Sequence, residues 1–318
     1  MQRPDLIGHV QAIMASAGFM VSERCDLRPV SFDLICRRDK DLVLLKVLTN
    51  VDALGEDIAN EIKLLCKFLD ARPLMVGIRA GTGALEDGVV YARHGIPIIT
   101  PNTLHDYALE GDAPMVFAAP GGFYVNLDVE TLRAVRIRLG LSLGVMAQIA
   151  GVSRRAIQMY EEGMSASIDA AMRLEDQLGV DLIRPLDPFR NYTATEYQAS
   201  ADKQAEDPTE ALVRNLLESL GYQFNATKRS PFNAISTQAN DSLLTGMGQD
   251  SPQLRRRAAI VASISQITGR PGFFVVERTN RTQLEGTPVM NRTEFLKLSD
   301  PEAILNLILE RQIRMTRE

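Results

Sequence analysis

The sequence is poor in the residues that build disulfide frameworks and zinc sites. It has three cysteines, Cys25, Cys36 and Cys66, and three histidines, and neither type recurs at a ligand spacing such as CxxC. An odd number of scattered cysteines indicates reduced residues of the core or the surface. We therefore expect no disulfide, no metal site and no cofactor.

The sequence also lacks an apolar run long enough to span a bilayer, which needs about 20 residues. Its first residues, Met1 to Asp5, lead into an amphipathic helix and not into a secretory signal. It shows no nucleophile elbow, and Thr245-Gly246-Met247-Gly248 lacks the lysine of a phosphate-binding loop. We expect a cytoplasmic protein that does not contact membranes.

The charge balance does not fit a protein that coats nucleic acid indiscriminately. The chain has 318 residues, of which 45% are hydrophobic and 24% charged, and its formal net charge is −5. The length is comfortable for two or three domains. If the protein binds DNA, the affinity has to come from local arginines and from the geometry of a dimer.

The most informative stretch consists of two short amphipathic helical patterns on either side of Ala150-Gly151-Val152. Ala147 is small enough for two helices to approach closely, and Gly151 suits the reversal because glycine accepts a positive φ. Ser153 is placed to cap the second helix. The apolar positions that recur at helical intervals are Met146, Ala150, Val152, Ile157 and Tyr160. The pattern predicts a helix-turn-helix.

This stretch resembles the Cro-repressor-like (XRE-type) helix-turn-helix family. Leu132 to Arg136 looks like the family's first helix, and the stretch from Ser167 to Val180 looks like its closing helices. The resemblance implies a five-helix domain that binds double-stranded DNA, in which an arginine can grip guanine with two hydrogen bonds. The residues that it places at the DNA are Ser142, Ser153, Arg154, Arg155 and Gln158. The alternative is a helical interaction module that does not bind DNA.

One residue departs from the family pattern. Ser142 is expected to cap the first helix of the motif, and the family has a polar residue, often glutamine, directly after this cap. Leu143 stands at that position here. The resemblance therefore does not carry over a phosphate contact at this position.

The amino-terminal part predicts an α/β layer domain. A helix is expected at 5–17, followed by strands near 19–21, 32–36 and 42–47 and a helix at 52–69. Further strands are expected at 75–78 and 96–99, with a short helix between them at 84–94.

This order resembles the restriction-endonuclease-like, PD-(D/E)xK, fold. Active members hold a divalent metal with two carboxylates and use a lysine to orient or activate water. Asp33 and Lys46 fit two of these places, but the second carboxylate is replaced by Leu44. Glu56 or Glu61 of the following helix could supply it. We expect a degenerate active site and no catalytic residues, with a metal-dependent nuclease using Asp33 and Lys46 as the alternative.

The carboxy-terminal part repeats this order. The helical pattern at 211–222 repeats the first helix, Phe232 to Ile235 parallels Phe32 to Ile35, and Asn233 and Gly246 stand where Asp33 and Lys46 stood. Arg255-Arg256-Arg257 opens a helix and is expected either to be solvated or to contact phosphate.

We therefore predict an α/β plus all-α protein with five segments. A restriction-endonuclease-like domain at 1–112 is followed by a β-hairpin connector at 113–127, for which a plain linker is the alternative. The helix-turn-helix domain spans 128–186, a linker spans 187–207, and a second α/β domain, a diverged duplicate of the first, spans 208–318.

The whole arrangement resembles archaeal HTH-type transcriptional regulators with a Cro-like domain between α/β segments. The resemblance implies a sequence-specific regulator that is not an enzyme. We expect it to act as a homodimer on a palindromic operator, because one short recognition helix contacts only a few base pairs. An unknown effector or partner protein that binds the α/β domains is a further possibility.

Overall fold

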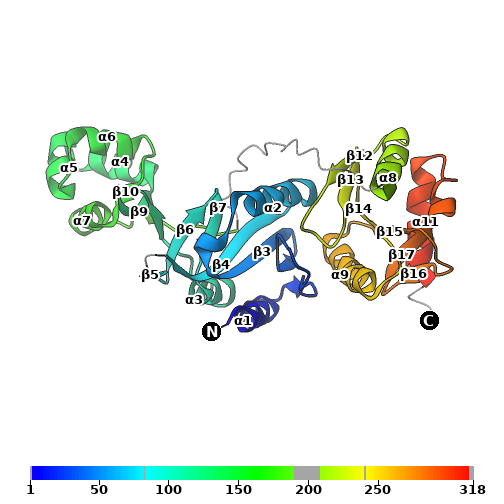
Figure 1. The fold of residues 1–318 in the computed structure, drawn as a ribbon. Helices are drawn as coiled ribbons and strands as arrows, with labels where there is room; N and C mark the ends of the chain where they lie inside the picture. The colour runs from blue at the N-terminus through cyan, green and yellow to red at the C-terminus, as the bar shows by residue number, and fades with distance from the viewer. Residues whose placement is uncertain (1, 82, 190–207, 240, 315–318) are drawn as a thin grey trace. The chain divides into compact units, whose positions relative to one another are not determined.

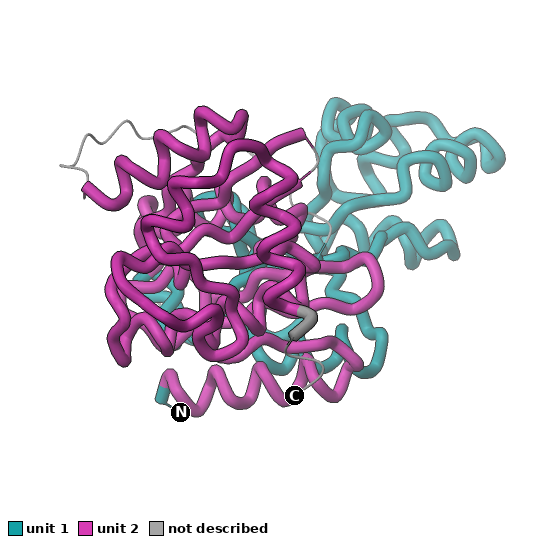
Figure 2. The backbone as a smooth tube through the Cα atoms, turned by 90° about the vertical axis from the view of Figure 1, so that its right-hand side faces the viewer, with its two compact units in different colours: residues 1–2, 48–53, 74–193 teal, residues 3–47, 54–73, 194–318 magenta. Residues whose placement is uncertain are grey.

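The computed structural model describes residues 2–81, 83–189, 208–239 and 241–314. These residues form two compact units (Figure 2). The first unit lies within residues 1–2, 48–53 and 74–193, and the second unit lies within residues 3–47, 54–73 and 194–318. The helix-turn-helix stretch belongs to the first unit, and the carboxy-terminal repeat belongs to the second.

The second unit begins with a helix, antiparallel strands and another helix (Figure 1). These elements are α1 (Arg3–Ser16), β1 (Met20–Val21), β2 (Leu34–Arg38), β3 (Asp41–Asn50) and α2 (Glu56–Leu69), with β3 passing into the first unit after Val47. Leu34 of β2 lies opposite Leu45 of β3. Residues 42–47 of β3 are all buried, as expected for a strand that is covered on both faces. The helices and strands predicted for this stretch are confirmed.

The first unit continues this α/β region with a second set of strands. Its elements are η1 (Val51–Ala53), β4 (Arg72–Ala80, from Leu74 in this unit), β5 (Gly83–Ala84), β6 (Val89–Arg93), β7 (Ile96–Ile99), α3 (Pro101–His105) and the π-helical η2 (Asp106–Glu110). β4 and β7 run parallel, with Met75 opposite Ile98. β6 pairs antiparallel with β7. The predicted strands near 75–78 and 96–99 are confirmed.

The short helix expected at 84–94 is wrong. No part of this stretch is helical, and its Val89–Arg93 segment is strand β6, whose Val89-Val90-Tyr91 run is of the β-branched and aromatic kind that favours strands. His94 (φ 50°) and Gly95 (φ 77°) form the turn into β7. Two successive positive φ angles are typical of a two-residue hairpin turn.

A β-hairpin joins this region to the helices of the first unit. β8 (Val116–Ala119) and β9 (Gly122–Leu127) pair antiparallel around Pro120 and Gly121. β8 also pairs with β6, while β9 pairs with β10 (Ala166–Ser167) and β11 (Ile183–Arg184). The hairpin is thus hydrogen-bonded to strands that precede and follow it in the chain.

The helix-turn-helix region contains four α-helices among its described residues, not the expected five. They are α4 (Val129–Arg138), α5 (Leu143–Ala150), α6 (Arg154–Glu161) and α7 (Ile168–Leu178). The chain after α7 forms β11 because Glu175 Oε1 accepts hydrogen bonds from the backbone amides of Leu182 (2.6 Å) and Ile183 (2.8 Å). Pro185 then prevents a helix from continuing.

The carboxy-terminal part of the second unit is a six-stranded sheet with helices. The strand order is β12-β13-β14-β15-β17-β16. Its elements are α8 (Pro208–Ser219), β12 (Gln223–Ala226), β13 (Ala234–Gln238), β14 (Asp241–Gly248), α9 (Pro252–Thr268), β15 (Gly272–Val276), β16 (Gln283–Leu284), β17 (Thr287–Asn291), α10 (Arg292–Phe295) and α11 (Pro301–Arg314).

The amino-terminal and carboxy-terminal α/β regions share local hydrogen bonds as well as element order. Asp33 N–H donates to Leu45 O, and Asn233 N–H donates to Thr245 O, both at 2.8 Å. β15 and β17 run parallel and β16 runs antiparallel to β17, as β4, β7 and β6 do. Asp33 and Asn233 therefore occupy equivalent positions, each directly before a strand.

The expected linker at 187–207 lies mostly outside the described residues. Its first residues are held in the first unit, where Asp187 Oδ1 accepts a hydrogen bond from Tyr107 (2.7 Å) and the Phe189 ring lies 5.1 Å from the Tyr107 ring. Within the described part of the chain, no helix is both long and apolar enough to cross a membrane.

Candidate functional site

The turn between α5 and α6 has the backbone that its sequence predicts. Gly151 ends α5 at φ 69°, in the left-handed region. A Cβ atom at this position would lie 2.3 Å from a guanidinium nitrogen of Arg173. Ala147, Ile157 and Tyr160 are buried in one hydrophobic cluster that joins the two helices. The turn and the shared hydrophobic cluster confirm the predicted helix-turn-helix.

Both serines that were placed at the DNA cap the helices of the motif. Ser142 Oγ accepts a hydrogen bond from Val145 N–H (3.2 Å) at the start of α5, and Ser153 Oγ accepts one from Ala156 N–H (3.1 Å) at the start of α6. Each hydroxyl keeps its own proton for a further acceptor. Because both serines are exposed, their hydroxyls and the adjacent helix N-termini are open to an anion.

The exposed face of α6 carries the polar side chains expected to read DNA. Arg154 and Arg155 are exposed, and within the described part of the chain neither guanidinium has a hydrogen-bond or ion-pair partner. Gln158 is exposed one turn further and donates to Glu162 Oε1 (3.2 Å). The structure therefore brings three of the predicted site residues together on one solvent-facing helix.

Leu143, the departure from the family pattern, belongs to the core. It is partly buried and packs against the hydrophobic cluster of the four helices. An aliphatic side chain cannot donate a hydrogen bond to phosphate, so only Ser142 offers a side-chain hydroxyl at the start of α5.

An ion pair to the buried carboxylate of Glu161 fixes α6 to α4, and the sequence did not predict it. Arg136 of α4 donates two hydrogen bonds to the carboxylate of Glu161, at 2.5 and 2.9 Å, and Arg133 donates to the Glu161 carbonyl oxygen. Glu161 is buried, and its hydrogen bond raises the pKa of Arg136 above the usual arginine value. The only sequence signal was a carboxylate on the apolar side of α6, and nothing local identified its partner.

The predicted pair Asp33 and Lys46 lies in the second unit as part of a buried ionic group. Lys46 Nζ lies 4.0 Å from Asp33 Oδ2 and donates a hydrogen bond to Val30 O (2.7 Å). Arg3 contacts Asp33 Oδ1 at 2.5 Å, and Val47 N–H donates to Asp33 Oδ2. Burial lowers the pKa of Lys46, while the Asp33 carboxylate acts in the opposite direction. Asp33 is thus neutralised by two side-chain cations in the place where an active nuclease would hold a metal.

The two glutamates that could have replaced the missing carboxylate have different surroundings. Glu56 is exposed at the start of α2. Glu61 is buried, and its carboxylate accepts hydrogen bonds from Arg229 N–H (2.7 Å) and Ser230 Oγ–H (2.9 Å) of the carboxy-terminal region. Leu44 is fully buried. Glu61 therefore contacts the other α/β region of the second unit, and its oxygens are already engaged.

The two positions of the carboxy-terminal region that correspond to Asp33 and Lys46 carry no carboxylate and no lysine. Asn233 Oδ1 accepts hydrogen bonds from Met247 N–H (3.0 Å) and from Arg257. A side chain at Gly246 would collide with the ring of Phe274, since a Cβ atom there would lie 2.3 Å from it. This place fits an asparagine–arginine contact and not a metal.

Each of the three arginines that open α9 has an acceptor within the second unit. Arg255 pairs with Asp250, Arg256 pairs with Glu23 and Asp26, and Arg257 donates to the Pro231 carbonyl oxygen. The expectation of a solvated face thus holds in part, because the side chains of Arg255 and Arg256 are about 40% exposed while they form their ion pairs, and the phosphate contact stays a prediction.

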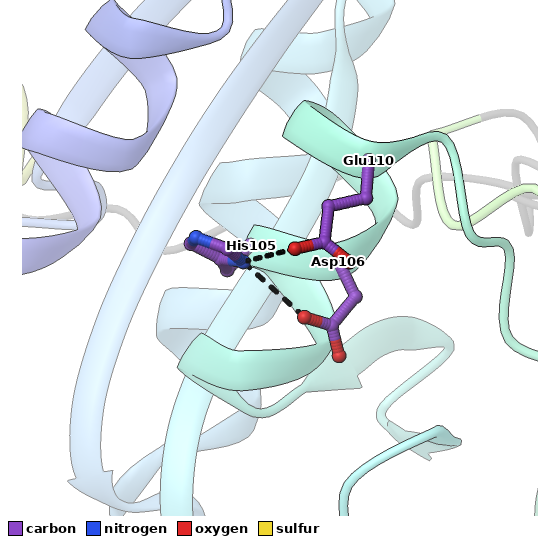
Figure 3. Close-up of side chains that lie close together, drawn as sticks. All are labelled: His105, Asp106 and Glu110. Atoms are coloured by element: carbon purple, nitrogen blue, oxygen red, sulfur yellow. Dashed lines mark hydrogen bonds and ion pairs between the residues drawn. The ribbon is translucent and has the colours of Figure 1, made fainter.

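One surface cluster in the first unit combines metal-binding residue types. His105 Nδ1 lies 3.2 Å from Asp106 Oδ1 and 3.9 Å from Glu110 Oε1 (Figure 3). The π-helical backbone of η2 brings these residues to one side. All three are at least partly exposed and already contact one another, which is the arrangement of a surface ion-pair cluster.

The second unit also contains a cavity of about 790 Å³ beside α9 and α11. It is lined mainly by small and polar residues, including Ser263, Gln266 and Glu285. Its volume lies in the range of small-molecule sites.

Two family models match separate stretches of the chain, and full-length relatives match nearly all of it. The family model described as PD-(D/E)XK superfamily domain matches residues 3–114, and the model described as Helix-turn-helix matches residues 132–183. A relative from Halorubrum lacusprofundi is 40% identical and covers 98% of each chain, and one from Natronomonas pharaonis is 37% identical over 98% of this chain and 99% of its own. Both are named "Putative HTH-type transcriptional regulatory protein". No solved structure matches the chain.

Proposed function

Because the chain belongs to the family of archaeal HTH-type transcriptional regulatory proteins, we propose that it reads a specific DNA sequence through α6. The observation that carries the proposal is the pair of exposed guanidinium groups of Arg154 and Arg155 at the start of a capped helix, which have no partner in the described part of the chain. A helix presented in this way fits the major groove of double-stranded DNA.

Each polar residue of the motif has a distinct role in this proposal. Arg154 and Arg155 donate to guanine edges or phosphates, and Gln158 pairs with adenine after leaving Glu162. Ser142 and Ser153 donate their hydroxyl protons to phosphate oxygens at the helix N-termini, where the backbone dipoles also attract anions. The phosphate contacts position the helix and the base contacts give specificity.

The protein acts as a homodimer on a palindromic operator in this proposal. One α6 covers only a few base pairs, and two copies must meet half-sites about 34 Å apart to reach a useful specificity. The net charge of −5 supports this reading, because a chain without overall positive charge depends on such local contacts.

The two α/β regions have a structural role and arose by duplication of one domain. The equivalent positions of Asp33 and Asn233, each directly before a strand and with matching backbone hydrogen bonds, support the duplication. The buried cations on Asp33, and the Asn233–Arg257 contact at the second place, support a fold that no longer serves nuclease chemistry.

Replacing Arg155 tests the proposal. Arg155→Ala should lose about 1–3 kcal/mol of discrimination between the preferred duplex and one with a changed base pair, since a two-bond contact to guanine is worth that much. Fluorescence anisotropy at fixed salt gives both affinities. Arg138→Ala, an exposed arginine at the end of α4, is the matched control and should leave the discrimination unchanged. Equal discrimination in wild type and Arg155→Ala would count against the proposal.

The second candidate function is a metal-dependent nuclease, which the PD-(D/E)XK match favours. Incubating supercoiled plasmid with the wild type and with Lys46→Ala, in Mg²⁺ or Mn²⁺, separates the two functions. We expect no cleavage by either protein, because Asp33 is buried and already paired with Arg3 and Lys46. Cleavage by the wild type that Lys46→Ala abolishes would establish the nuclease.

A further inference from the structure

Three side chains that can each bind a metal converge where α3 passes into η2. The donor atoms of His105, Asp106 and Glu110 all lie within 4.8 Å of one another. Figure 3 shows both carboxylates turned toward the His105 ring, whose Nδ1 lies 3.2 Å from Asp106 Oδ1 and 3.9 Å from Glu110 Oε1. One imidazole nitrogen and two carboxylate oxygens form a ligand set that transition metals such as Zn²⁺ accept.

The π-helical turn brings Glu110 next to His105. In an α-helix, which has about 3.6 residues per turn, residues five apart lie on different faces. η2 has wider turns, closed by i→i+5 bonds such as the one that Gly111 N–H donates to Asp106 O, so that residues five apart lie one turn apart. The spacing in the sequence therefore did not indicate the cluster. Single π turns are frequent at functional sites.

The backbone that carries the three side chains is held from both ends. Thr100 caps α3 by accepting a hydrogen bond from Thr103 N–H (3.1 Å). Within η2, Tyr107 donates to Asp187 Oδ1 (2.7 Å) and its ring packs edge-on against Phe189. Ligands on a backbone that packing and hydrogen bonds already hold need little reorganisation to bind a metal.

The charge of the cluster favours a divalent cation. In the stretches of chain that the structure describes, no lysine or arginine lies within ion-pair distance of the Asp106 or Glu110 carboxylate. His105 can supply at most one positive charge against two negative ones. Two carboxylates held this close repel each other, and a divalent cation between them removes the repulsion.

We propose that His105, Asp106 and Glu110 form a binding site for a divalent transition-metal ion, for which Zn²⁺ fits best. Tetrahedral coordination with bonds of about 2.0–2.2 Å separates the ligand atoms by about 3.4 Å. The two separations from His105 Nδ1, 3.2 and 3.9 Å, bracket this value. The atoms that form the ion-pair contacts are thus the atoms that bind the metal, after only small side-chain movements. All three residues are at least partly exposed, so that water completes the coordination.

Calorimetric titration of the tag-free full chain with ZnCl₂ tests the site. The wild type should bind one Zn²⁺ per chain with micromolar affinity. His105→Ala and the isosteric Glu110→Gln should each weaken binding about 100-fold or more, because even residues outside a ligand set commonly cost about 10–100-fold when lost. His9→Ala, at an exposed histidine of α1, is the matched control and should bind Zn²⁺ as the wild type does. Circular dichroism verifies that each variant is folded.

The outcomes decide on the metal site alone. A wild type that binds no Zn²⁺ below millimolar concentration overturns the proposal. Unchanged binding in folded His105→Ala or Glu110→Gln also overturns it, because other residues, such as the three buried cysteines that both variants keep, would then hold the ion. Binding that both variants lose and His9→Ala keeps supports the site. None of these variants changes α6, so the DNA-reading proposal stands or falls separately.

A second readout is the melting temperature of the full chain. A metal that binds only the folded state stabilises it, so Zn²⁺ should raise the melting temperature of the wild type and of His9→Ala. It should leave His105→Ala and Glu110→Gln unchanged. An equal rise in all four proteins would contradict the assignment of the site to this cluster.

Discussion

At the scale of single residues, the deciding feature is how each charged group is partnered. Arg154 and Arg155 are exposed and have no partner among the residues that the structure describes, whereas Asp33 is buried between Arg3 and Lys46. Exposed cations are available to a polyanion at little desolvation cost, while a buried and neutralised carboxylate is not available to a metal. The guanidinium groups of Arg154 and Arg155 are therefore accessible from solvent, whereas the carboxylate of Asp33 is already engaged.

Removing Asp33 should be costly. Asp33→Ala leaves Lys46 and part of Arg3 buried without their carboxylate, and we expect a loss of about 3–5 kcal/mol in the free energy of unfolding. Urea unfolding of the full chain measures it. Glu56→Ala, at an exposed carboxylate at the start of α2, should change stability by less than about 1 kcal/mol. A wild-type melting temperature that rises with Mg²⁺ or Mn²⁺, and does so only while Asp33 is present, would instead identify a working metal site.

Predictions about single residues are confirmed where they depend only on residues close by in the sequence. The caps at Ser142 and Ser153 and the positive φ of Gly151 depend on residues within four positions, and all three are confirmed. The partner of Glu161 lies 25 residues away on another helix, and the partners of Glu61 lie more than 160 residues away. Such contacts are set by tertiary packing, which a single sequence does not display.

At the scale of elements, the link between α4 and α6 determines how α6, the proposed DNA-reading helix, is held. Glu161→Gln keeps the shape of the side chain but removes its charge, so that Arg136 loses a buried two-bond partner. We expect DNA affinity to fall by a similar factor for all sequences while the preferred sequence stays the same, because the reading side chains are unchanged. Anisotropy with the preferred and the mismatched duplex measures both. Glu162→Gln, its exposed neighbour, should have little effect. A changed sequence preference in Glu161→Gln would contradict a purely positioning role.

Two predictions about whole elements are wrong, because contacts with distant parts of the chain outweigh the local sequence pattern. The stretch 84–94 forms β6 because its β-prone residues find partners in β7 and β8, and neither partner is evident from the stretch itself. The fifth helix is absent because the backbone after α7 bonds to Glu175 and to β9. In contrast, long patterns with clear periodicity, such as those of α1, α2 and α9, were predicted from the sequence.

At the scale of the whole molecule, each unit combines segments that are distant in the sequence. The second unit joins residues 3–47 and 54–73 to the carboxy-terminal region, and the hairpin of the first unit pairs with strands on both sides of it in the chain. The repeat of residue pairs such as Phe32-Asp33 and Phe232-Asn233 could be recognised from the sequence. The contact between the two α/β regions could not, because its ion pairs involve charged residues without a distinguishing pattern.

The measurement that tests the central claim most directly is selection of bound sequences from a random duplex pool by the full chain at a stated salt concentration. The phosphate contribution to affinity varies steeply with salt, so that a fixed moderate salt favours base reading over non-specific binding. The account predicts a palindromic motif whose half-sites lie about one helical turn apart and contain guanines that Arg155→Ala no longer selects. Recovery of a pool without any enriched motif would contradict it.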